Sequence, residues 1–280
     1  MRSRRSIGAI SAEISKAPAA RMKKTPAWRR IARLALLCAH LVRGLSIAAF
    51  RYPRLSPEGR DAEKRRWSGR LLSILGVSVR ETNDAPALPA RCMLVLNHIS
   101  WLDIFVIDAL LPATFVAKAE IRSWPMAGWL CTLVGTIYIE RGKRAGARRA
   151  RDEIAGELAQ GTLIAICPEG TTTFGDTLER FHAALFQPAI DAGADIQPLA
   201  LRYVDGAGRR TDAAGYVGDT SFLGSLWSVV STPHMTAEIT YTTGFGAAGQ
   251  ERRAIADRAE SAIAAALRIP LPRMSSTAPE

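Results

Sequence analysis

The amino-acid sequence predicts an α/β fold with a mostly parallel central sheet flanked by helices, preceded by a basic, apolar N-terminal helix pair. Two observations support this prediction. From Gly76 onward, short apolar runs alternate with amphipathic segments, which is typical of parallel strands covered by helices on both faces. Before that point the chain is basic and contains one long apolar segment. A chain of 280 residues is also long enough to bury a substantial core.

Composition divides the chain into four parts. Residues 1–25 form a basic tail rich in serine and alanine, for which we expect disorder. Residues 26–75 form a helix pair that we expect to associate with a membrane, and residues 76–269 form one α/β domain. For residues 270–280 we expect a loose C-terminal tail. The tail at the N-terminus lacks the prompt apolar region and the cleavage site of a secretory signal.

The positive charge is concentrated in the first quarter of the chain. Residues 1–70 hold 18 lysines and arginines against 4 acidic residues, whereas residues 71–280 hold 19 against 22. A basic arm favours contact with nucleic acid or with an anionic membrane, or it is simply a solvated tail. A nucleic-acid-binding domain spreads basic residues over its folded surface, so the slightly acidic body argues against nucleic acid.

The four cysteines occur singly among apolar neighbours, with no C-x-x-C pair. This pattern predicts small buried hydrophobic residues in a reducing compartment and argues against a zinc site. They are Cys38, Cys92, Cys131 and Cys167.

The segment Ile31–Phe50 is the most apolar stretch and, at 20 residues, is just long enough to cross a bilayer. Arg33 near its start could extend to the membrane surface, but Arg43 lies deep in the segment, where its charge is costly. Arginines flank both ends, so the charge pattern selects no orientation. We therefore favour an interfacial helix over a single span, with a buried core helix as the third alternative. Pro53 ends the segment, and a second helix is expected over Pro57–Leu75.

The α/β part follows from alternating patterns that end at glycine, proline or polar residues. The expected strands are Val77–Arg80, Cys92–Leu96, Thr114–Ala117, Thr136–Glu140, Thr162–Cys167, Ile196–Tyr203 and Thr236–Thr242. The expected helices are Trp101–Leu111, Met126–Val134, Ala147–Gln160, Phe181–Ala192, Phe222–Ser231 and Glu251–Leu267, with a long loop at residues 205–221.

The stretch from Val95 to Asp103 carries the clearest chemical signal. His98 follows an apolar strand, and Asp103 lies five residues later in the first turn of a helix. A histidine and a carboxylate in this arrangement suit a general base and the acid that orients it. The alternative is purely structural, because Ser100 and Asp103 also have the spacing of a helix N-cap near the positive end of the helix dipole.

Polar residues follow three further strands, and in a parallel sheet such residues meet at one edge. They include Lys118, Arg141 and the turn Glu169-Gly170-Thr171. The planar guanidinium of Arg141 matches an anion, and a glycine lets backbone N–H groups approach an oxyanion. Structural alternatives remain: Arg141 pairs with Glu140, and the glycine lies in an ordinary turn. A histidine base, a guanidinium and this turn together suit attack of a hydroxyl on an acyl carbonyl near an anionic group.

These motifs resemble those of the glycerolipid acyltransferase family typified by bacterial lysophosphatidic acid acyltransferase. The N-H-x-x-x-x-D motif is matched by Asn97, His98 and Asp103, A-K-x-E-[LI] by Ala117–Ile121 with Pro125 and Gly128, G-x-[IF]-[FY]-[IV]-x-R by Gly135–Arg141, P-E-G-T by Pro168–Thr171, and a proline-containing strand by Ile196–Ala200. The matches span residues 90–203 in the order of the family. Residues 76–269 would then be the acyltransferase domain.

The resemblance implies roles for individual residues. His98 would take the proton from the acceptor hydroxyl, and Asp103 would hold its imidazole in the right tautomer. The hydroxyl oxygen would attack the thioester directly, without an acyl-enzyme, while Arg141 and the turn at residues 169–171 position the head group. The substrate-binding residues that it implies are Asn97, Lys118, Arg141, Glu169, Gly170, Thr171 and Thr172.

The resemblance also implies the partners. The donor would be acyl-CoA or acyl carrier protein, and the acceptor a lysolipid, foremost 1-acyl-sn-glycerol-3-phosphate, which would become phosphatidic acid in membrane phospholipid biosynthesis. The enzyme would act on an anionic membrane surface at the cytoplasmic face of the inner membrane. We expect no metal, no redox cofactor and no nucleic acid.

One position departs from the pattern of the family. Thr172 stands where an arginine is usual, and a buried guanidinium contact of this kind is worth about 1.5–3 kcal/mol. Its loss weakens the case for a phosphate-bearing acceptor. Lyso-ornithine lipid, or another lysolipid without that phosphate, is therefore the alternative acceptor.

Two other function classes are compatible with parts of the sequence. A non-catalytic module could use the basic N-terminus to bind a membrane or nucleic acid, and it would show salt-sensitive binding without turnover. A hydrolase could use the same histidine and aspartate on thioesters, and it would release free thiol without an acceptor.

Overall fold

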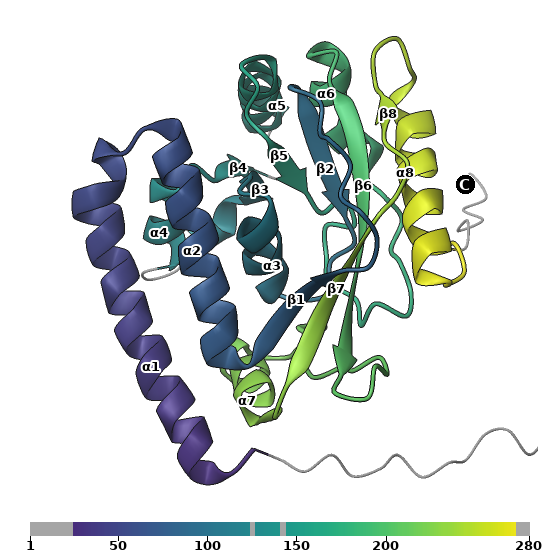
Figure 1. Cartoon of the computed structure of the whole chain (residues 1–280). Coiled ribbons are helices and arrows are strands. Elements are labelled where there is room, and N and C mark those ends of the chain that lie inside the picture. The colour runs from purple at the N-terminus through teal and green to yellow at the C-terminus, as the bar shows by residue number, and fades with distance from the viewer. Residues whose placement is uncertain (1–24, 124–126, 141–143, 273–280) are drawn as a thin grey trace, which may run out of the picture.

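The structure is a computed structural model, and it describes residues 25–123, 127–140 and 144–272 (Figure 1). The expected N-terminal disorder and most of the C-terminal tail lie outside these residues. The described part holds one eight-stranded sheet in the order β1-β7-β6-β2-β5-β3-β4, with the short β8 paired to β6. The strands are β1 (Val77–Glu81), β2 (Cys92–Leu96), β3 (Thr114–Lys118), β4 (Ile137–Ile139), β5 (Ile164–Ile166), β6 (Asp195–Asp205), β7 (Met235–Tyr241) and β8 (Phe245–Gly246).

The sheet is mostly parallel, which confirms the predicted fold class. All neighbouring strands are parallel except β7 and β8, which each run antiparallel to β6. The parallel strands β2, β3, β4, β5 and β6 therefore end at the same edge. This edge is where the polar residues of the sequence motifs follow their strands.

Helices cover both faces of the sheet, as Figure 1 shows for α1, α2 and α3 on one side and α8 on the other. The helices are α1 (Ala27–Ser46), α2 (Pro57–Leu75), α3 (Leu102–Leu110), α4 (Ala127–Leu133), α5 (Arg144–Ala159), α6 (Gln187–Asp191), α7 (Phe222–Ser231) and α8 (Arg252–Leu267). Short helical turns add η1 (Ile47–Arg51), η2 (Tyr52–Arg54), η3 (Ala119–Ser123) and η4 (Ala183–Phe186).

The central strand β2 explains why its sequence is a continuous apolar run. All five of its residues are buried. Leu94 and Leu96 pack into the core on the side of α2 and α3, whereas Met93 and Val95 pack into the core on the side of α5 and α8. A strand buried on both faces needs apolar side chains at every position. This rigid strand ends two residues before His98 and fixes its position.

The N-terminal helix is neither a buried core helix nor a free one. The stretch Ala27–Arg54 is long and apolar enough to cross a membrane, by length and composition alone. Of its most apolar 18 residues, only 22% are buried inside the protein. Arg33 does not extend toward a membrane surface: its guanidinium donates to the carbonyls of Val230 (3.0 Å), Thr232 (2.6 Å) and Pro233 (2.7 Å). It thereby satisfies carbonyl groups that the C-terminus of α7 leaves unpaired.

Three predictions about local structure are corrected. The segment expected as one helix over Phe181–Ala192 begins with extended residues, because the Phe181 N–H donates to Glu260 and the His182 N–H to the Pro168 carbonyl. Helical turns start only at η4. The two-residue strand β8 was not predicted, since it is too short to show a pattern. Cys38, expected to be buried, is exposed on α1.

Candidate active site

The candidate site lies where β2 ends and α3 begins. His98 follows β2 directly, and Asp103 occupies the first turn of α3. The side chain of His98 keeps a quarter of its surface exposed, whereas that of Asp103 is almost completely buried. A rigid strand and a helix start therefore fix the two residues on either side of a short turn.

The two side chains form a hydrogen-bonded pair. Nδ1 of His98 lies 2.8 Å from Oδ2 of Asp103. The same oxygen accepts the backbone N–H groups of Ile99 (2.7 Å) and Ser100 (2.9 Å). Asp103 is thus both the cap of this turn and the partner of His98, so the structural and the chemical interpretation describe one arrangement. Because Nδ1 faces a carboxylate, Nε2 is the ring nitrogen left for a substrate.

Tyr203 is a member of this site that the sequence did not reveal. It lies on β6, is fully buried, and donates its hydroxyl to Oδ1 of Asp103 at 2.8 Å. Burial, followed by the charge of Asp103, raises the pKa of Tyr203 well above its usual range, so it stays a neutral donor. A tyrosine inside an apolar strand is indistinguishable from a core residue in the sequence.

Tyr203→Phe removes only the hydroxyl that binds Asp103. We expect a loss of about 1–3 kcal/mol in the free energy of unfolding, because one carboxylate oxygen is left buried without a partner. Denaturant unfolding of the wild type and the variant measures this difference. An unchanged midpoint and slope would show that the hydroxyl does not support Asp103.

The environment of His98 favours its protonated form in the free protein. Burial lowers the pKa of His98, but the Cys167 sulfur and then the Asp103 carboxylate outweigh it and hold the pKa well above the usual value. Cys167 lies just beyond β5, next to the end of β2. Asp103 therefore stabilises the imidazolium that forms when His98 accepts a proton.

Glu169 binds the backbone of His98 and not its imidazole. Its Oε1 accepts the backbone N–H of His98 at 2.6 Å, and its Oε2 accepts that of Glu179 at 2.8 Å. The residue is 3% exposed, and burial raises the pKa of Glu169 to about 7. Gly170 follows with a positive φ of 68°, which suits glycine in this turn. The geometry makes Glu169 a positioning residue rather than one that reaches the head group.

Asn97 is also engaged within the protein. Its amide donates to the Leu201 carbonyl (2.9 Å) and accepts the Leu201 N–H (2.8 Å). Asn97 is completely buried, so no atom of it is exposed for the predicted contact with substrate. Its side chain instead continues the pairing of β2 with β6 beyond the last residue of β2.

The threonines after Gly170 have different environments. Thr171 is exposed, whereas the hydroxyl of Thr172 donates to the backbone carbonyl of Tyr216. The Tyr216 N–H in turn donates to the Ile99 carbonyl at 3.1 Å. The long loop between β6 and α7 is therefore tied to both motifs that carry the site. The hydroxyl of Thr172 is used in this tie.

Of the two cationic residues predicted to bind substrate, Lys118 and Arg141, the structure describes only Lys118. Lys118 ends β3 and is exposed, and it is paired in register with Ile139 of β4. Arg141 lies outside the described residues. Among the residues that are described, there is no group of three histidine, cysteine or acidic side chains that could hold a metal ion.

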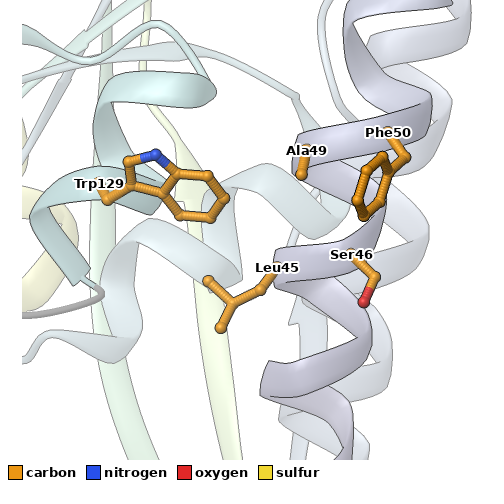
Figure 2. Close-up of a pocket in the computed structure, with 5 residues that line it drawn as sticks. All are labelled: Leu45, Ser46, Ala49, Phe50 and Trp129. Atoms are coloured by element: carbon orange, nitrogen blue, oxygen red, sulfur yellow. The ribbon is translucent and has the colours of Figure 1, made fainter.

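A separate apolar pocket of about 460 Å³ opens between the end of α1 and α4. Figure 2 shows the indole of Trp129 on α4 facing Leu45, Ala49 and Phe50 across this pocket. None of its lining residues belongs to the site around His98.

Comparisons with known proteins show which family the chain belongs to. The family model described as Acyltransferase matches residues 77–202, which include all the motifs up to β6. The lyso-ornithine lipid O-acyltransferase of Pseudomonas aeruginosa is 36% identical over 247 residues, which covers 85% of this chain and 93% of the relative. The 1-acyl-sn-glycerol-3-phosphate acyltransferase of Neisseria meningitidis serogroup B is 35% identical over 210 residues, 75% of this chain and 82% of the relative.

A solved structure has the same fold. The crystal structure of the 1-acyl-sn-glycerophosphate acyltransferase from Thermotoga maritima is similar with a TM-score of 0.61 at 19% identity, and the match covers 86% of this chain and 96% of that one. The two relatives share about one third of their residues with this chain, over at least three quarters of it. The chain belongs to the acyltransferase family.

Proposed function

We propose that the protein transfers a fatty acyl group from acyl-CoA or acyl carrier protein to the free hydroxyl of a lysolipid. The observation that carries the proposal is the pair of His98 and Asp103, in which Asp103 binds Nδ1 and leaves Nε2 as the ring nitrogen that can act on a substrate. A histidine held in this way acts as a general base on a hydroxyl. The family relationship supports acyl transfer as the reaction class.

The reaction balances with the groups at hand. Nε2 of His98 takes the acceptor proton while the hydroxyl oxygen bonds to the thioester carbonyl carbon. The carbon–sulfur bond then breaks, and the imidazolium returns the proton to the departing thiolate. Asp103 stabilises the imidazolium between these steps, and Tyr203 and two backbone N–H groups hold Asp103 in place. No covalent acyl-enzyme and no metal is needed in this scheme.

The acceptor in this proposal is 1-acyl-sn-glycerol-3-phosphate, and lyso-ornithine lipid is the second candidate. The first has support from the Neisseria relative and from Arg141, which would bind a phosphate. The second has support from Thr172, which replaces the usual arginine, and from the Pseudomonas relative. Incubating the purified protein with labelled acyl-CoA or acyl carrier protein and each acceptor decides between them. Label in neither product would refute the proposed function.

Thr172→Arg is expected to shift acceptor preference toward the phosphate-bearing lysolipid. A restored guanidinium contact should change the ratio of kcat/KM for the two acceptors by about 10- to 100-fold. Thr172→Val is the matched control, because it also breaks the tie to Tyr216 but adds no charge. If both variants change the ratio equally, the loop tie and not the charge controls the acceptor.

We further propose that α1 lies in the plane of the membrane surface, at the cytoplasmic face of the inner membrane. The stretch from α1 through η2 carries six arginines and no acidic residue, which favours an anionic leaflet. Phe50 and Val42 on it are largely exposed, at 72% and 62%. A spanning α1 would carry the charged α2, against which it packs, into the hydrocarbon.

A further inference from the structure

Besides α1, the helix α7 exposes apolar side chains, and it lies next to the site. On α7, Phe222 is 42% exposed, Leu223 is 74% exposed and Trp227 is 52% exposed. The sequence from residue 220 to residue 233 contains no charged side chain. Exposed aromatic and aliphatic side chains without any interspersed charge are unusual on a surface that faces only water.

The helix is attached to α1 at one end. The Thr25 N–H donates to the Ser231 carbonyl at 3.0 Å, and Arg33 binds the carbonyls that follow α7. The guanidinium of Arg30 lies 5.1 Å from the ring centroid of Trp227. Figure 1 shows α7 beside the N-terminal end of α1. The apolar surface of α7 is therefore continuous with the apolar helix that we place on the membrane.

The helix also contacts the catalytic motif. The ring of Trp101, which lies between His98 and Asp103 in sequence, is 5.3 Å from the ring of Phe222, centroid to centroid. Its Nε1 donates to the buried hydroxyl of Ser225 at 3.1 Å. A ligand that covers Phe222 and Leu223 would thus lie beside the turn that carries His98.

We propose that α7 is a second membrane-inserting element, which seats Phe222, Leu223 and Trp227 in an anionic bilayer beside the catalytic motif. A bilayer fits better than a protein partner because the surface continues onto α1, whose arginines have no acidic neighbours in residues 27–54. Tryptophan with an arginine over its ring suits the headgroup region, where an apolar body and a cation are both solvated. The link to catalysis rests on the proposed lipid acceptor, but the binding itself does not.

Leu223→Glu and Leu223→Gln test this proposal, because Leu223 is the most exposed residue of the set. Leu271→Glu is the matched control: Leu271 is a 52% exposed leucine that follows α8, and its variant carries the same charge change. Sedimentation of the full chain with vesicles of phosphatidylglycerol and phosphatidylethanolamine measures binding. We expect the Leu223→Glu variant to bind about tenfold more weakly and the Leu223→Gln variant less severely so, with the control unchanged.

A second measurement separates membrane contact from damage to the site. KM for a lysolipid in the same vesicles should rise with the loss of binding, whereas turnover of a short-chain acceptor dissolved as monomers should not change. Vesicle binding by both Leu223 variants equal to that of Leu271→Glu would overturn the proposal. So would a change in self-association with vesicle binding intact, since a second copy would then cover α7. If the wild type transfers no acyl group, the proposed function fails while the vesicle experiment still tests α7.

Discussion

His98→Ala is expected to lower kcat for acyl transfer by about 10²- to 10⁴-fold, the usual contribution of a general base. Of the His98 and Asp103 side chains, only that of His98 reaches the surface. Its removal takes away Nε2, and Asp103 is too deeply buried to replace it as the base. The measurement is transfer of radiolabelled acyl groups to a lysolipid, with folding checked by thermal unfolding and membrane binding by sedimentation.

His182→Ala is the matched control for this variant. His182 is exposed and its backbone, not its side chain, binds the Pro168 carbonyl. It should keep the activity of the wild type. A folded, membrane-bound His98→Ala variant with wild-type activity would end the assignment of His98 as the base.

Asp103→Asn is expected to lower kcat by about 10²-fold or more and to change its dependence on pH. The amide is nearly isosteric, but it removes the charge that stabilises the imidazolium. Because the pKa of His98 is held above its usual value, activity of the wild type should rise with pH, with a midpoint above about 6.5. In the variant the midpoint should move to lower pH, since neutral histidine is then reached earlier.

The pH profile of kcat/KM separates this role from a structural one. If Asp103 only capped the turn before α3, the variant would lose activity without a shift of the midpoint. A shift to higher pH would contradict the role that we assign to the carboxylate.

Local sequence patterns predicted those parts of the fold and of the site that short-range contacts determine. The bounds of β2, α2 and α7 follow from apolar runs and capping residues, and the pair of His98 and Asp103 is separated by only five residues. The fold class followed from the alternation of strands and helices. These features depend on neighbours in the chain, which a sequence displays.

The supporting contacts could not be predicted because they join distant segments. Tyr203 binds Asp103 across 100 residues, and Glu169 binds the backbone of His98 across 71. Nothing local distinguishes Tyr203 from other apolar strand residues. Glu169 was expected to reach the substrate, and its buried contacts emerge only when β2 and β5 lie side by side.

Arg33 shows how the same limit affects the N-terminal helix. A cation near the end of an apolar segment suits a membrane surface, and the sequence offers no other partner nearby. The structure supplies carbonyl groups about 200 residues later, at the end of α7. This contact joins the C-terminal end of α7 to α1.

Release of thiol from acyl-CoA or acyl carrier protein by the wild-type protein, measured with and without a lysolipid, distinguishes acyl transfer from hydrolysis. We expect release only when the acceptor is present, in equal amount to the acylated product, because the acceptor hydroxyl itself is the nucleophile that His98 activates. Thiol release at the same rate without acceptor, with free fatty acid as the product, would contradict direct transfer to the acceptor and identify a hydrolase.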